Sequence, residues 1–203
     1  MALRPDDVTL AHATARLGVG GDDLAALGET FCQAMAALGI DGAPVFEHLA
    51  AGRDIGQALS VSSEVIDALY ARAHGWFALG RAGRALTLFR ALCLLDAGNA
   101  DYWVGYGVCL RLTQQPEHAR RAFTAAARLR PAWAVPHFHA LELAIAIKRP
   151  DEARVSLAAY EERASRETPP AIVQEARRLR AFLASWPEVP CRSADTPHPA
   201  GSP

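Results

Sequence analysis

Apolar residues recur at steps of three and four along most of the chain, which is the spacing of helices that bury one face. The first such run begins at Asp22 and ends at Gly39, a residue type that commonly terminates helices. A shorter helical piece is expected around residues 44–51. The apolar stripe of the first helix consists of Leu24, Leu27, Phe31, Met35 and Leu38.

From Ile66 onward the pattern repeats, with copies at 66–99, 100–133 and 134–167. A period of about 34 residues is typical of stacked tetratricopeptide-type helical hairpins. Small residues that let two helices approach coincide at position 20 of the copies, and larger ones that fill the space between hairpins coincide at position 24. These are Ala85, Ala119 and Ala153 at position 20, and Phe89, Phe123 and Leu157 at position 24.

Turn residues agree with this register. Gly80–Gly83, Gln114–Pro116 and Lys148–Pro150 fall where the two helices of each hairpin should be joined. Pro116 and Pro150 precede acidic residues, and both features suit the first turn of a helix.

Pro169 and Pro170 interrupt the pattern after the third copy. A further helix over about 171–185 is expected to cap the array, with arginines on its outer face. Residues 187–203, rich in proline, predict a disordered tail, and residues 1–21 predict a flexible arm. The apolar face of the capping helix consists of Ile172, Ala176, Leu179 and Leu183.

The predicted fold is all-α: a right-handed superhelix of three tetratricopeptide-type hairpins over 66–167. A helical segment, 22–65, precedes it, and a capping helix lies within 168–186. The composition is ordinary for a globular protein, since half of the 203 residues are apolar and a fifth are charged.

Charge and hydropathy exclude several classes of function. The formal net charge is −1, so the chain lacks the basic excess that grips nucleic acid. No run of apolar residues approaches the roughly 20 needed to cross a bilayer. Arg4, Asp6 and Asp7 lie where a signal peptide would be apolar, which predicts a cytoplasmic protein.

The residues offer no site for catalysis, metal or cofactor. His137 and His139, two apart on a helix, point in different directions and should not chelate one ion. No serine, threonine or cysteine stands in a nucleophile motif, which argues against an enzyme. The scattered cysteines, which we expect to be reduced, are Cys32, Cys93, Cys109 and Cys191.

The concave face of the predicted array is unusually apolar and aromatic, which is typical of a binding surface. We expect it to hold an extended peptide, unless the N-terminal or C-terminal helix folds over it. The groove positions are Tyr70, His74 and Phe77 in the first copy, Val104, Val108, Arg111 and Leu112 in the second, and Phe138, Glu142 and Ile145 in the third. Asp67, Ala78, Asp101, Val135 and Ala146 occupy the remaining concave positions.

Four segments resemble one family, the class II chaperones of bacterial type III secretion (LcrH/SycD-type). They are Ile55–Leu59 (IGQAL), Phe89–Asp96 (FRALCLLD), Tyr102–Gly107 (YWVGYG) and Val135–Glu142 (VPHFHALE). The resemblance implies a cytoplasmic, non-enzymatic chaperone that keeps hydrophobic translocators soluble by binding a short Pro- and Leu-containing segment. The implied pocket walls are Tyr70, His74, Phe77, Val104, Val108, Leu112 and Phe138.

Members of that family are often homodimers through their N-terminal helices. The stripe from Leu24 to Leu38 could form such a seam or pack within the chain. Two other classes of protein fit the same repeats: a generic scaffold that binds a folded partner on its convex face, and a regulatory partner of a transcription factor. The sequence identifies no client.

Overall fold

The computed structural model describes residues 21–37, 39, 41–51 and 53–186, and within these ranges it contains helices and no strands. The predicted all-α class is therefore confirmed. The predicted tail, 187–203, lies outside the described residues. So does the predicted arm, 1–21, apart from Gly21, which begins the first described helix.

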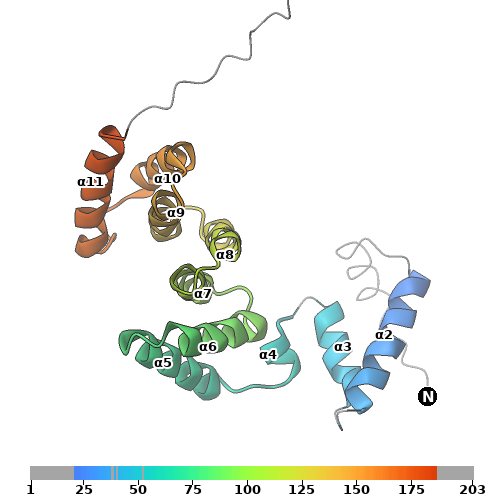
Figure 1. The fold of residues 1–203 in the computed structure, drawn as a ribbon. Coiled ribbons are helices and arrows are strands. Elements are labelled where there is room, and N and C mark those ends of the chain that lie inside the picture. The colour runs from blue at the N-terminus through green and yellow to red at the C-terminus, as the bar shows by residue number, and fades with distance from the viewer. Residues whose placement is uncertain (1–20, 38, 40, 52, 187–203) are drawn as a thin grey trace, which may run out of the picture.

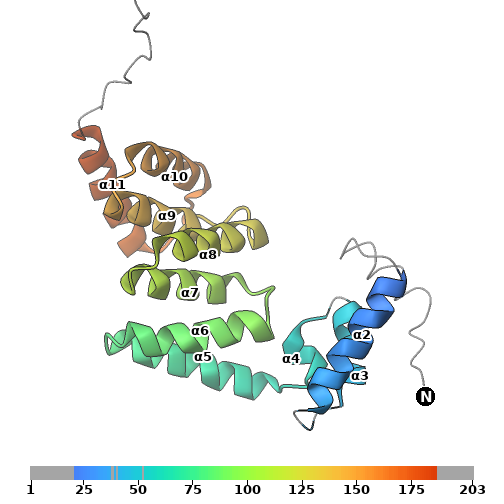
Figure 2. The same cartoon turned by 45° about the vertical axis from the view of Figure 1, so that its right-hand side comes forward.

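Three helical hairpins form the centre of the molecule (Figure 1). The first pairs α5 (Ser63–Ala78) with α6 (Ala82–Leu95), and the second pairs α7 (Ala100–Leu112) with α8 (Pro116–Leu129). The third pairs α9 (Val135–Ala146) with α10 (Pro150–Arg163). Figure 2 shows these helices stacked one on the next, so that α6 packs on α7 and α8 on α9.

The turn inside each hairpin has the same backbone shape. Gly80, Gln114 and Lys148 stand 34 residues apart in sequence and adopt positive φ angles of 69°, 59° and 58°. Each lies two residues after the first helix of its hairpin ends. Pro116 and Pro150 occupy the first turn of the following helix, as predicted.

Complementary pairs of side chains fill the interior of the hairpins. The position-20 alanines Ala85, Ala119 and Ala153 are completely buried. In the second copy, position 8 is Gly107 and position 24 is the large Phe123. A Cβ atom added to Gly107 would lie 2.5 Å from the Phe123 ring. In the third copy, the larger Leu141 is combined with the smaller residue at position 24, Leu157. The combined volume therefore stays similar, and the third copy folds like the others.

The last helix, α11 (Pro170–Ala184), closes the C-terminal end of the array. Its apolar face packs on α9 and α10, as the sequence predicts. Ile172, Ala176 and Leu179 join Phe138 and Tyr160 in one cluster, and Leu183 joins Leu141 in a second.

At the other end, α2 (Gly21–Ala36), α3 (Gly42–Ala50) and α4 (Ile55–Ala58) precede the hairpins. Helix α2 packs on α3, α3 on α4, and α4 on α6. Both views place α2 and α3 to one side of the stack. Met35 contacts α3 at Gly42, which is intrachain packing. The side chains of the other predicted seam residues, Leu24, Leu27, Phe31 and Leu38, lie outside the described part of the chain.

Candidate peptide-binding groove

The first helix of each hairpin contributes to a pocket of about 290 Å³ on the inner side of the array. Tyr70, His74 and Phe77 come from successive turns of α5, while Val104 and Val108 come from α7. These five residues were all predicted to face the groove. The lining contains no residue of α2, α3, α4 or α11.

Aromatic contacts fix the α5 wall of this pocket. The Tyr70 ring meets the His74 ring edge-on, with 4.5 Å between the ring centroids. The tilted Tyr102 ring lies 5.2 Å from Tyr70, again between centroids. Both Tyr70 and His74 also meet the buried Phe89 ring edge-on. Burial, assisted by the nearby carboxylate of Asp101, raises the pKa of Tyr70. Phe77, by contrast, remains 39% exposed and offers its ring to a ligand.

Four residues that sequence reasoning did not assign to the groove also line the pocket: Phe89, Gly105, Trp133 and His139. A side chain on Gly105 would overlap the Phe89 ring. Because this position is glycine, no side chain fills the bottom of the pocket. Trp133 lies in the connection before α9, where helical periodicity gives no orientation. Its size at the end of a repeat was the available signal.

A polar cluster borders the pocket on the side of α9. The Glu142 carboxylate lies 2.7 Å from Nδ1 of His139 and 3.2 Å from Nη2 of Arg111. The His139 ring also stacks on Phe123, at 5.7 Å between centroids. Arg111 and Glu142 therefore satisfy each other's charge, and their ion pair forms a rim outside the pocket lining.

The structure corrects the prediction for the third copy. Phe138 is only 4% exposed and packs against Tyr160 and Ala176, outside the pocket lining. Ile145 packs on the cluster that contains Leu183. The reason is that α11 covers this part of α9. Leu112 is 50% exposed and also lies outside the pocket lining.

The other sites considered in the sequence show little that could bind a metal. No group of three or more histidine, cysteine or acidic residues in the described part of the chain could hold a metal. His139 bonds to Glu142, whereas burial and the neighbouring Arg163 lower the pKa of His137. No helix among the described residues is long and apolar enough to cross a membrane.

The described cysteines are unpaired thiols. Cys93 and Cys109 are buried, and Cys32 is partly buried. Burial raises the pKa of Cys93 to about 12 and that of Cys109 to about 11, so both stay protonated and unreactive. Cys191 lies outside the described residues.

Comparison with curated proteins finds a partial match, and no family model matches the chain. The chain is 29% identical over 75 residues to the chaperone protein SicA of Salmonella typhimurium. The match covers 37% of this chain and 46% of SicA, so the chain spans about half the length of the curated relatives it matches.

Solved structures match over more of the chain. The type III secretion translocator chaperone SycD of Yersinia enterocolitica aligns with a TM-score of 0.58 and 23% identity, covering 66% of this chain and 98% of SycD. PcrH of Pseudomonas aeruginosa aligns with a TM-score of 0.54 and 27% identity, covering 61% of this chain and 92% of PcrH. The chain thus has the fold of the type III secretion translocator chaperones, and the resemblance found in its sequence is confirmed.

Proposed function

We propose that this protein is a cytoplasmic type III secretion chaperone that binds an extended segment of hydrophobic translocator proteins and keeps them soluble before secretion. The observation that carries the proposal is the apolar pocket between α5 and α7, whose lining includes no residue of the described helices α2, α3, α4 and α11. SycD has been solved with a peptide of the translocator YopD, and PcrH with the chaperone binding regions of PopD and PopB.

The chemistry of the pocket favours a partner with aliphatic or proline side chains. Tyr70, Phe77 and the two α7 valines provide apolar surface, while His74 makes the first wall more polar. Burying one leucine side chain there contributes about 1.5–3 kcal/mol. Losing such an anchor weakens binding by roughly 10- to 100-fold, because 1.4 kcal/mol corresponds to a factor of ten. The proposed role is binding alone, with no chemical step.

Co-expression tests this function directly. A translocator from the same genome, with long apolar segments, should accumulate in the soluble fraction only when this chain is present. Translocators that stay equally insoluble with and without the chain would contradict the proposal.

Two valines make a matched pair for the groove. Val104→Asp places a charge in the pocket and should lower the affinity for the translocator by at least about tenfold, because the carboxylate loses water when an apolar residue docks. Val155→Asp changes a valine of α10 that is 71% exposed and should leave binding unchanged. Titration of both variants, with circular dichroism to check folding, gives the comparison. Equal affinities would contradict the assignment of the groove.

We also propose that the N-terminal helix joins two copies into a homodimer, which SycD forms in its solved structures. The double variant Leu24→Asp, Leu27→Asp should sediment as a monomer while the unchanged chain sediments as a dimer. A monomeric unchanged chain would reject this part of the proposal and leave the groove unaffected.

A further inference from the structure

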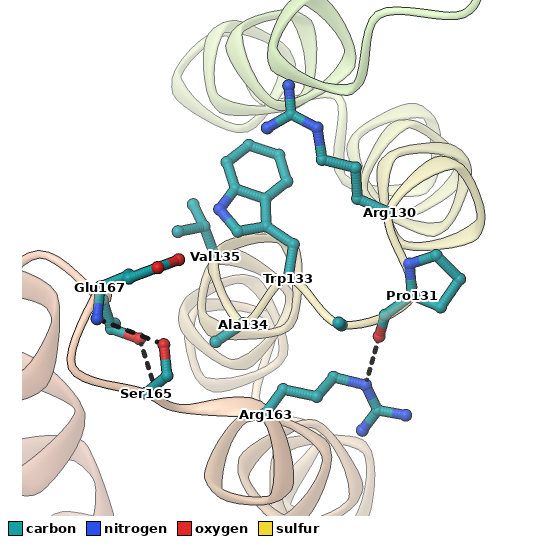
Figure 3. A pocket seen from close by; sticks show the side chains of 10 residues that line it. Arg130, Pro131, Trp133, Ala134, Val135, Arg163, Ser165 and Glu167 are labelled. Carbon is teal, nitrogen blue, oxygen red and sulfur yellow. Dashed lines mark hydrogen bonds between the residues drawn. The ribbon is translucent and has the colours of Figure 1, made fainter.

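A second, larger hollow of about 530 Å³ lies beside the groove, where two connecting segments face each other (Figure 3). One wall runs from Arg130 to Val135, between α8 and α9. The opposite wall runs from Arg163, at the end of α10, to Thr168, before α11. We call this hollow the edge pocket.

Hydrogen bonds hold both walls of the edge pocket in place. Arg163 donates from Nε to the Pro131 carbonyl at 2.8 Å and thereby ties α10 to the α8–α9 connection (Figure 3). The Ser165 amide donates to the Thr168 hydroxyl at 3.0 Å, and the Glu167 amide donates to the Ser165 hydroxyl. The shape of the pocket is therefore built into the fold.

Trp133 connects the edge pocket with the groove, because its side chain lines both. The Arg130 guanidinium lies 4.7 Å from the centre of the indole ring and pairs with the carboxylate of Asp101. Asp101 lines the groove, whereas Arg130 lines the edge pocket. The two hollows therefore meet at one tryptophan, with an ion pair between them.

The chemistry of the two hollows differs. The groove is lined mainly by aromatic and aliphatic side chains, whereas guanidinium groups, hydroxyl groups and the Glu167 carboxylate also line the edge pocket. An extended peptide carries one carbonyl acceptor and one amide donor per residue. Such a lining can satisfy both kinds of main-chain group, together with polar side chains.

We infer that the edge pocket is a second subsite, which holds the polar, extended stretch next to the apolar anchor of the same translocator segment. Trp133 then sets the register, because the apolar residue lies on one side of its ring and the polar stretch on the other. This inference rests on the proposed chaperone function. It adds a requirement for polar residues within a few positions of the anchor.

Photo-crosslinking in the full-length chain tests the inference. The photoreactive residue p-benzoylphenylalanine replaces Ala132 in the edge pocket, Phe77 in the groove, or Thr124, which is exposed on α8. Each variant is co-expressed with the translocator of the same genome, irradiated and analysed by mass spectrometry. The edge-pocket and groove variants should both crosslink to the translocator, at sites within about eight residues of each other, and the Thr124 variant should not.

The outcomes separate this inference from the proposed function. Crosslinks at Phe77 without crosslinks at Ala132 would overturn the edge pocket and leave the groove intact. Crosslinks at neither position, with the translocator insoluble, would overturn both. Crosslinks at all three positions would mean non-specific capture and also overturn the subsite.

Blocking the pocket gives a second measurement. Ala132→Trp should fill the edge pocket and lower the affinity for a long peptide, with anchor and polar stretch, by about tenfold, since a few lost hydrogen bonds suffice for this. A short peptide with the anchor alone should bind the variant and the unchanged chain equally. Ala132→Ser is the control for the substitution itself. Equal affinities of the long peptide for both variants would contradict the inference.

Discussion

At the scale of single residues, glycines set how closely the helices approach. Gly107 leaves room for the Phe123 ring, which is only 1% exposed and cannot shift because it is buried in the core. Gly107→Ala should therefore lower the free energy of unfolding by about 1–3 kcal/mol, as overpacked cores do. The matched control is Gly75→Ala in α5, where an added Cβ meets nothing within 4 Å and should stabilise by about 0.5–1 kcal/mol. Urea denaturation of both variants measures the difference, and equal shifts would contradict this packing.

The hairpin turns give a second residue-scale prediction. Gln114 and Lys148 adopt positive φ angles that disfavour side chains, while the equivalent residue of the first hairpin is glycine. Gln114→Gly and Lys148→Gly should each raise the free energy of unfolding by about 0.5–1 kcal/mol, because glycine accepts this conformation without strain. The midpoint of thermal unfolding should rise accordingly. Arg121→Gly, at an exposed position in the middle of α8, should lower it instead. A loss of stability in both turn variants would contradict the turn geometry.

At the scale of elements, α11 decides the role of the third hairpin. Because α11 covers Phe138, this residue is part of the core. Phe138→Ala should cost about 3–5 kcal/mol, as large core truncations do. Phe182→Ala removes a phenylalanine of α11 that is 50% exposed and should cost much less. Denaturation curves provide the test. A Phe138→Ala protein of unchanged stability would return this residue to the groove.

At the scale of the whole molecule, the buried thiols report on the cooperativity of the array. Their raised pKa values keep Cys93 and Cys109 protonated while the chain is folded, so thiol reagents should modify them only after unfolding. In a Cys32→Ser, Cys191→Ser background, labelling at pH 8 should be slow and should accelerate with urea at the unfolding midpoint. Rapid labelling without urea would show that the array opens locally.

The same thiols predict a direction of pH dependence. Their folded pKa values lie above those in the unfolded chain, so their contribution to stability is complete below about pH 8.5. It should decline as the pH rises toward 11 to 12, because the unfolded chain gains thiolates that the folded chain excludes. Replacing both cysteines by alanine should flatten this part of the stability profile.

Much of this protein was determined by its sequence alone, since hairpin stacking depends on local pattern. The alanines at position 20, the prolines that begin α8 and α10, and the α5 and α7 residues that line the pocket all follow from a repeat register. Each element contacts its neighbours in sequence, so position within a repeat nearly fixes direction in space.

Tertiary structure decided what the register leaves open. The repeat treats Tyr70 and Phe138 alike, but α7 leaves the first at a pocket, whereas α11 buries the second. Trp133 lies between helices, where no period gives a direction, and only packing brings its ring to both hollows. These differences depend on which element comes next in space and on the size of its side chains, which no single repeat encodes.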